Sequence, residues 1–304
     1  MKLVSYSAAD KPRFGAIVGT RIVDLARASA AFQAKDAMIQ LLPERIEAFF
    51  DDIEALESSL RRVVDLAADA PAELSIPLDG ATLLPPIARP PKIICVARNY
   101  AEHAKEAGLE ISPIPIIFAR FAATLVADGA PIVVPAVSDN LDWEGELAII
   151  IGKHSKGRRI GQAEAMDYVF GYSIFNDVTV RDYQFRVTQY TAGKNFRHSG
   201  PFGPMIVTAD EIADPHNLEI ITTLNGRVEQ RANTSTMIYD IPTILEHIAD
   251  FIDLEPGDLI PTGTPAGVGF KRKPPLFLKD GDLITVEIPG IGILTNPVIA
   301  EKGL

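Results

Sequence analysis

Residues 141–151 read LDWEGELAIII, an acidic cluster that runs directly into five aliphatic residues. A short, uninterrupted aliphatic run is typical of a strand that is buried on both faces of a sheet. Side chains two apart on a strand point to the same side, so Glu144 and Glu146 share a face, which Asp142 could join. The stretch therefore predicts a buried strand that begins in a group of like charges.

Carboxylates buried without partners are costly, because they lose hydration and repel one another. A divalent cation would turn that cost into a binding site, and a ligand set of oxygens favours Mg²⁺, Mn²⁺ or Ca²⁺ over zinc. Asp177 follows the strand-like run 170–176 and is a candidate third ligand. The alternative interpretation is a solvated strand end, since a Glu-x-Glu pair alone is a weak signal.

The composition is that of a globular protein with a sizeable core. The chain has 304 residues, of which 47% are apolar, and a formal net charge of −11. Such an acidic balance argues against nucleic acid as a partner. The single cysteine, Cys95, excludes an intrachain disulfide and lies in an apolar run that predicts a buried position. The sequence shows no signal peptide and no aliphatic run long enough to span a bilayer, so we expect a cytoplasmic enzyme with no membrane partner.

Two regions of different character predict an α+β fold. In the first, short strands are expected at 2–6, 13–18 and 20–25, followed by helical spacing of apolar residues over 26–70. The proline-rich segment 77–92 suits an extended connector. Beyond it, strands are expected at 93–96, 132–134, 146–151, 169–175, 218–224 and 283–288, with short helices near 100–107 and 241–251. We therefore expect a small N-terminal α/β domain at 1–80 and a β-rich domain with a rolled or barrel-like sheet at 81–304.

Residues 98–108 read RNYAEHAKEAG and predict a short helix that ends at Gly108. His103 and Glu106 are three apart and share a helix face, where they can hydrogen-bond. A carboxylate beside an imidazole raises its basicity, which suits a general base acting on water. The alternative interpretation is a chance pair on an exposed helix.

Two glycine-rich turns carry further polar side chains. Lys194 lies in the turn 191–196 and Thr264 in the turn 261–269. Neither turn has the spacing of a phosphate-binding loop or of a dinucleotide fingerprint. A lysine and a threonine hydroxyl in such turns are suited to holding a carboxylate, although each could also be an ordinary turn.

Taken together and in this order, these pieces resemble the fumarylacetoacetate hydrolase family, in its acylpyruvate hydrolase and 2-oxo-diacid isomerase-like branch. The match runs from about residue 84 to the C-terminus, and its landmarks are 93–106, 142–152, 171–184, 193–196, 224–226, 233–237 and 254–269. The resemblance implies a distorted β-roll preceded by a small domain, usually in a homodimer.

The resemblance also implies a role for each candidate residue. Glu144, Glu146 and Asp177 match the ligands of a divalent metal, Mg²⁺ or Mn²⁺, with Ca²⁺ as a further option. His103 and Glu106 match a dyad that activates water. The remaining matches are Lys194, which would stabilise developing negative charge, Thr264, which would contact the substrate carboxylate, and Arg181, Gln184 and Tyr100, which would face the substrate.

Three positions depart from the family pattern. Arg120 and Ala123 stand where many members carry lysine and serine, and Arg197 replaces an acidic residue. We expect these changes to affect the identity of the substrate more than the metal site.

The resemblance implies a small-molecule substrate, a 2-oxo or 1,3-dicarbonyl acid. Metal-dependent hydrolysis of a carbon–carbon bond in an acylpyruvate-type acid is favoured, because both dyad residues are present. An oxaloacetate-type decarboxylase and a 2-hydroxy-diene-dioate isomerase remain open, since all three reactions pass through an enolate. The alternative from a different functional class is a non-catalytic binding or structural protein with the same fold. We also expect the segment 100–112, which includes Leu109, to form a lid over the site.

Overall fold

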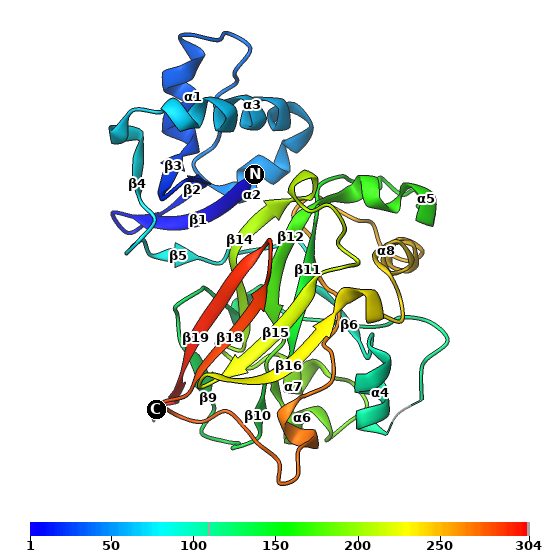
Figure 1. Ribbon diagram of the computed structural model, residues 1–304. Helices are drawn as coiled ribbons and strands as arrows, with labels where there is room; N and C mark the ends of the chain where they lie inside the picture. The colour runs from blue at the N-terminus through cyan, green and yellow to red at the C-terminus, as the bar shows by residue number, and fades with distance from the viewer. Residues whose placement is uncertain (109, 303–304) are drawn as a thin grey trace.

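The computed structural model describes residues 1–108 and 110–302. An N-terminal unit of strands and helices sits at one end of a larger β-rich body (Figure 1). The first elements are β1 (Lys2–Ala8), β2 (Lys11–Val18), β3 (Arg21–Asp24), α1 (Leu25–Gln33), α2 (Ile46–Asp51), α3 (Ile53–Leu66), β4 (Ser75–Pro77) and β5 (Leu83–Leu84). The later strands are β6 (Ile94–Ala97), β7 (Ile116–Ala119), β8 (Leu125–Val126), β9 (Ile132–Val134), β10 (Leu141–Asp142), β11 (Gly145–Ile151), β12 (Val169–Asn176), β13 (Thr179–Val180), β14 (Gly200–Thr208), β15 (Glu219–Leu224), β16 (Arg227–Asn233), β17 (Leu259–Pro261), β18 (Leu283–Ile288) and β19 (Gly292–Ala300). The later helices are α4 (Ala101–Ala107), α5 (Gln162–Ala165), α6 (Arg181–Gln184), α7 (Thr191–Lys194) and α8 (Ile241–Ala249).

Two large sheets form the body of the protein, which confirms the predicted β-rich α+β fold. The larger sheet has the strand order β17-β11-β12-β14-β1-β2-β3-β4, with β5 and β8 attached beside it. The second sheet has the order β16-β15-β18-β19-β9. Within the described ranges neither sheet closes into a barrel. Because β1 pairs with β14, the N-terminal strands continue the larger sheet, and a domain division at residue 80 stays a prediction.

Strand β11 is the predicted buried strand, and every residue in it is buried. Its side chains alternate between two hydrophobic clusters: Ala148 and Ile150 pack in one, Leu147 and Ile149 in the other. At its start β11 lies so close to the second sheet that a Cβ on Gly145 would overlap side chains of β15 and β18. Glycine is therefore needed between the two glutamates.

The helical segment of the N-terminal unit is interrupted. Residues 34–45 contain no helix and separate α1 from α2, although the apolar spacing suggested helix over the whole of 26–70. The buried faces of the three helices pack into the same cluster as β2 and β11. No helix within the described ranges is long and apolar enough to cross a membrane.

The carboxylate of Asp24 ties the first strands to α1. It accepts hydrogen bonds from Nε of Arg13 at 2.8 Å and from the hydroxyl of Tyr6 at 2.9 Å. It also caps α1 by accepting the backbone N–H of Arg27 at 2.9 Å. Burial raises the pKa of Asp24, but these partners outweigh it and leave the pKa below its ordinary value.

Replacing Asp24 with alanine is expected to lower the free energy of unfolding by roughly 3 kcal/mol, because Arg13 and Tyr6 lose their buried acceptor. Urea denaturation measures this, with Asp24→Asn as a control that keeps the helix cap. Since the folded pKa is lowered, the contribution is complete above the ordinary aspartate pKa of about 4 and is lost as the pH falls through the folded value. Equal midpoints for the wild type and Asp24→Ala at pH 7 would contradict this role.

Candidate active site

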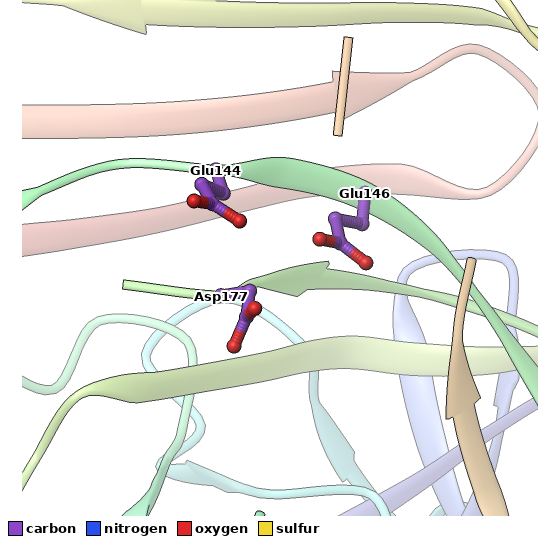
Figure 2. Close-up of side chains that lie close together, drawn as sticks. All are labelled: Glu144, Glu146 and Asp177. Carbon is purple, nitrogen blue, oxygen red and sulfur yellow. The ribbon is translucent and has the colours of Figure 1, made fainter. Parts of the chain in front are cut away.

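Three carboxylates meet where β11 begins and β12 ends (Figure 2). Glu144, Glu146 and Asp177 each offer an oxygen, and these oxygens lie within 4.8 Å of one another. All three side chains are buried. Antiparallel pairing of Gly145 with Asn176 joins the two strand ends, and the backbone N–H of Asp177 donates to the carbonyl of Glu144 at 2.8 Å. The structure thus places the predicted third carboxylate beside the first two.

Positive side chains surround two of these carboxylates. Nζ of Lys194 lies 2.8 Å from Glu144 and 2.5 Å from Asp177. Arg181 contacts Glu144 at 2.6 Å, and Arg120 contacts Asp177 at 2.5 Å. Burial raises the pKa of Glu144, but Lys194 and Arg181 outweigh it and lower that pKa to about 2. Burial lowers the pKa of Lys194, but its two carboxylates raise it above the ordinary value.

Glu146 decides whether a cation fits this cluster. Within the described residues no lysine or arginine lies at ion-pair distance from Glu146, and its one hydrogen bond comes from the backbone N–H of Gly263 at 2.8 Å. Burial, followed by the charges of Asp177 and Glu144, raises the pKa of Glu146 well above its ordinary value. A divalent cation would supply the positive charge that Glu146 lacks, so the donor set fits one.

Asp142 does not join the carboxylate cluster, and the structure gives it a different place. Its side chain accepts Nε of Arg181 at 2.8 Å, the backbone N–H of Gly269 at 2.7 Å and that of Phe270 at 3.0 Å. The backbone N–H of Trp143 donates a fourth hydrogen bond at 2.8 Å, so each oxygen of Asp142 accepts two. Asp142 therefore anchors Arg181 and the loop after Thr264 and is not a candidate ligand.

Two short helices bring Arg181 and Lys194 to the cluster. Arg181 begins α6 and Lys194 ends α7. The helices pack so closely that a Cβ on Gly193 would lie 2.6 Å from Cα of Gln184. The glycine of the Gly-Lys pair is therefore required for the lysine to reach the carboxylates.

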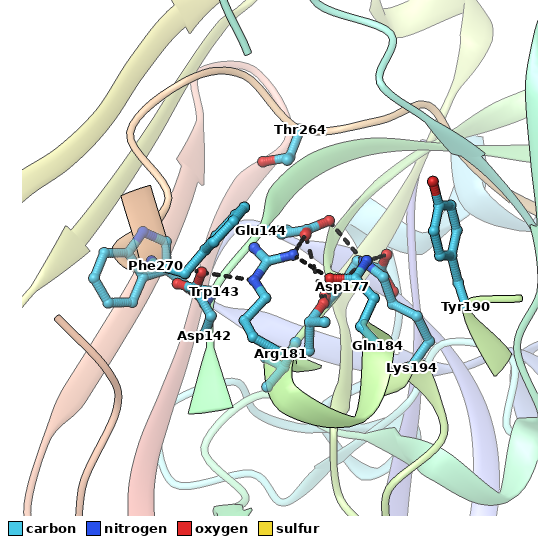
Figure 3. A network of polar contacts seen from close by, with 12 residues as sticks. Asp142, Trp143, Glu144, Asp177, Arg181, Gln184, Tyr190, Lys194, Thr264 and Phe270 are labelled. Atoms are coloured by element: carbon cyan, nitrogen blue, oxygen red, sulfur yellow. Dashed lines mark hydrogen bonds and ion pairs between the residues drawn. The ribbon is translucent and has the colours of Figure 1, made fainter. Parts of the chain in front are cut away.

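A cavity of about 390 Å³ is lined by Glu144, Arg181 and Lys194, whose ion pairs are drawn in Figure 3. Arg181 lines this space. Its Nη1 donates to Gln184 at 3.0 Å, whereas the buried Nη2 has no hydrogen-bond partner among the described residues. The ring of Phe270 lies 4.3 Å from its Cζ. An unpartnered guanidinium edge is suited to a carboxylate. The sequence-predicted residues that line the cavity are His103, Glu144, Arg181, Gln184, Lys194 and Thr264.

The predicted dyad residues share one face of α4 but are not hydrogen-bonded. Nδ1 of His103 lies 3.7 Å from Glu106, and this buried nitrogen has no hydrogen-bond partner among the described residues. Glu106 instead accepts the backbone N–H of Gly267 at 3.1 Å. Of the two, only His103 is among the described residues that line the cavity.

Thr264 and Tyr100, the other predicted substrate residues, differ in position. The hydroxyl of Thr264 lines the cavity, donates to the carbonyl of Gly145 at 3.0 Å and accepts from Gln230 at 2.9 Å. Tyr100 is buried and is not among the described lining residues. Burial, then the charge of Glu146, raises the pKa of Tyr100, whose hydroxyl has no hydrogen-bond partner among the described residues.

The positions that depart from the family pattern do not form part of the cavity wall as the structure describes it. Arg120 holds Asp177 and donates to Ser199 at 2.7 Å, so it supports the carboxylate cluster. Arg197 is 80% exposed and contacts Glu301 at 3.6 Å on the surface. The expectation that these changes affect the substrate more than the metal site stays a prediction, and Arg120 contacts a candidate ligand.

Several wall residues were not predicted from the sequence. Arg98 stands directly before the helix of His103, where its position beside a candidate catalytic helix was a usable signal. Tyr190 and the aromatic and aliphatic side chains around it carried no such signal, because their residue types are equally common in a hydrophobic core. The other unpredicted members of the wall include Phe118, Phe185, Val187 and Phe270.

Known proteins similar to this chain include proteins named as a tautomerase and as hydrolases. The chain is 42% identical over 260 residues to "Oxaloacetate tautomerase FAHD2A, mitochondrial" of Homo sapiens, covering 85% of this chain and 81% of that protein. That name places the human protein in mitochondria, so a cytoplasmic location stays a prediction here.

Solved structures agree with this likeness. Fumarylacetoacetate hydrolase from psychrophilic Exiguobacterium antarcticum has a TM-score of 0.78 and 35% identity, covering 99% of this chain and 100% of that one. Maleylpyruvate hydrolase from Sphingobium sp. SYK-6, in complex with manganese (II) ion and pyruvate, has a TM-score of 0.77 and 30% identity at the same coverage. Residues 92–299 match the family model described as fumarylacetoacetate (FAA) hydrolase C-terminal. The chain belongs to the fumarylacetoacetate hydrolase family.

Proposed function

We propose that this protein is a divalent-metal-dependent enzyme that interconverts the keto and enol forms of a small 2-oxo acid, with oxaloacetate as the first candidate. The observation that carries the proposal is one cavity wall that combines Glu144, a member of the carboxylate cluster, with His103 and Arg181. The 42% identity to a protein named oxaloacetate tautomerase supports the choice of substrate.

The groups on the cavity wall suit separate tasks. A divalent cation held by Glu144, Glu146 and Asp177 would polarise the carbonyl of the bound acid. Arg181 binds the substrate carboxylate through its unpartnered Nη2. Lys194 adds a positive charge to the wall, where negative charge develops on the C2 oxygen.

His103 is suited to move the proton. Nζ of Lys194 is engaged by two carboxylates, whereas Nδ1 of His103 has no hydrogen-bond partner among the described residues. In the keto-to-enol direction, His103 removes a proton from C3, and the electron pair of that bond forms the C2–C3 double bond. The electron pair of the C2–O π bond moves onto the oxygen, which then takes the proton back from the imidazolium of His103 to complete the enol. The reverse sequence uses the same groups, and no water attacks.

Hydrolysis of an acylpyruvate-type carbon–carbon bond is the second candidate. The likeness to a maleylpyruvate hydrolase and the shared helix face of His103 and Glu106 favour it. It requires Glu106 to orient His103 for attack by water. Their 3.7 Å separation is longer than a hydrogen bond, so tautomerisation is the better fit to this geometry.

A substrate panel separates the candidates. Each assay contains the protein and Mg²⁺ or Mn²⁺. In the first, enol oxaloacetate is added, and the loss of enol absorbance and the release of CO₂ are followed together. In the second, an acylpyruvate is added and the release of pyruvate is followed. We expect the enol absorbance to fall much faster than it does in buffer alone, without release of an equal amount of CO₂. Loss of enol absorbance at the buffer rate with cleavage of the acylpyruvate would replace our proposal with hydrolysis. Binding without turnover of either acid would favour a non-catalytic role.

The segment 100–112 is expected to act as a lid, although Leu109 lies outside the described residues. The backbone N–H of Gly267 donates a hydrogen bond to Glu106 of helix α4. The hydroxyl of Tyr239 donates one to the backbone carbonyl of Ser112. A helix this short has little stability of its own. Adding metal with oxalate, an enolate mimic, should slow amide exchange in 101–107. Equal exchange with and without oxalate would rule out the lid.

We also propose a homodimer, which rests on the family resemblance. Light scattering at micromolar concentration should give about twice the chain mass of 32.9 kDa. A monomer mass under the same conditions would contradict the dimer.

A further inference from the structure

Arg98 is a positive side chain on the cavity wall for which the proposed reaction has no use. Its Nη2 donates to the hydroxyl of Tyr190 at 2.6 Å, and its Cζ lies 5.9 Å from the ring centroid of Tyr190. No carboxylate of the described residues lies within ion-pair distance of it. A guanidinium that faces a cavity with only a phenol as partner retains donors for an anion.

The backbone holds Arg98 in a conformation that side-chain-bearing residues seldom adopt. Its φ is +57°, in the left-handed region. The next residue, Asn99, fixes this turn: its side chain donates to the carbonyls of Thr262 at 2.8 Å and Tyr239 at 3.0 Å and accepts the N–H of Tyr239 at 2.8 Å. Such strain persists where surrounding contacts over-determine it, which is common at ligand sites.

Two aromatic rings connect Arg98 to the carboxylate cluster. Nζ of Lys194 lies 5.1 Å from the ring of Phe118, and Phe118 packs edge-on against Tyr190 at 5.6 Å between centroids. In Figure 3, Tyr190 stands beyond Lys194, on the side of that lysine away from Arg181. The cavity wall therefore carries Arg98 on one side of these two rings and Lys194 on the other.

We propose that Arg98, held by Tyr190, binds the distal carboxylate of a 2-oxo dicarboxylate and so makes the site prefer diacids over monoacids. This inference rests on the proposed function in one respect, namely that a 2-oxo acid occupies the cavity. A carboxylate accepts two parallel hydrogen bonds from a guanidinium, whereas a methyl group at the same place leaves the guanidinium unpaired.

Two matched pairs of acids test it. Oxaloacetate is compared with 2-oxobutanoate, and 2-oxoglutarate with 2-oxopentanoate, so that each pair differs only by a terminal carboxylate in place of a methyl group. Dissociation or inhibition constants are measured with Mn²⁺ present for the wild type, Arg98→Met, Arg98→Lys and Tyr190→Phe. Arg197→Met is the control, because it removes an equal charge from a side chain that is 80% exposed outside the cavity.

The wild type should bind the diacid of at least one pair about 10- to 100-fold more tightly, the range expected for a charged hydrogen-bonded contact. Arg98→Met should abolish that preference with the monoacid constant unchanged. Arg98→Lys should keep part of it, Tyr190→Phe should lower it, and Arg197→Met should leave it intact. A preference that survives Arg98→Met, or its absence from the wild type, overturns the inference. An Arg98-dependent preference in a protein without tautomerase activity would leave the inference standing and remove the proposed function.

Discussion

Replacing Glu146 with alanine is expected to lower the affinity for Mn²⁺ by more than about 100-fold, above the 10- to 100-fold range typical of partners that only support ligands. The reason is the position of Glu146 in the cluster. Glu144 and Asp177 have lysine and arginine partners, whereas Glu146 has only a backbone N–H among the described residues. The cation that would offset its charge is therefore the metal itself. Calorimetry or the paramagnetic signal of free Mn²⁺ measures the change.

Glu146→Gln sharpens this test, because it keeps the size of the side chain and removes only the charge. It should bind Mn²⁺ as poorly as Glu146→Ala while folding as well as the wild type by circular dichroism. Glu73→Gln, at an exposed carboxylate of the N-terminal unit, is the matched control and should bind normally. Wild-type affinity in Glu146→Gln would remove Glu146 from the ligand set.

Replacing His103 with alanine is expected to slow enol–keto conversion by about 10²- to 10⁴-fold, the range for loss of a general base. Metal affinity should stay close to that of the wild type, because His103 is not one of the clustered carboxylates. Glu106→Gln should cost less than about tenfold, since Glu106 neither lines the cavity in the described residues nor hydrogen-bonds to His103. Initial rates at saturating metal measure both effects.

The comparison of these two variants distinguishes tautomerisation from hydrolysis. Tautomerisation requires one proton carrier, whereas hydrolysis requires the histidine and the glutamate to act as a unit on water. Equally severe losses in His103→Ala and Glu106→Gln would therefore support the hydrolytic dyad. An unimpaired His103→Ala would remove the imidazole from proton transfer altogether.

Local pattern was sufficient to predict the strand that builds the site. The alternation that places Glu144 and Glu146 together is a property of any strand, and the aliphatic run required a buried one. Asp177 was identified because it follows a second strand-like run, and antiparallel pairing of β11 with β12 then brings the two ends together. Cys95, read as a core residue from its apolar neighbours, is buried.

Contacts between distant segments could not be read in the same way. Asp142 looked like a fourth member of the cluster because its partners, Arg181 and the N–H groups of Gly269 and Phe270, lie far along the chain. Arg120 directly follows β7, which pairs with β6, and its contact with Asp177 joins residues 57 apart in the chain. The gap in the helices at 34–45 reflects the same limit, since apolar spacing continues through a loop whose residues also pack on the core.

The central claim, a metal-dependent tautomerase at this cavity, is tested most directly by one assay on metal-free protein. Protein stripped with EDTA and freed of chelator is mixed with enol oxaloacetate, and the loss of enol absorbance is followed before and after Mg²⁺ or Mn²⁺ is added back. We predict decay at the buffer rate in the stripped protein and full recovery with either ion, with no recovery in Glu146→Gln. Undiminished activity in the metal-free protein would contradict the account.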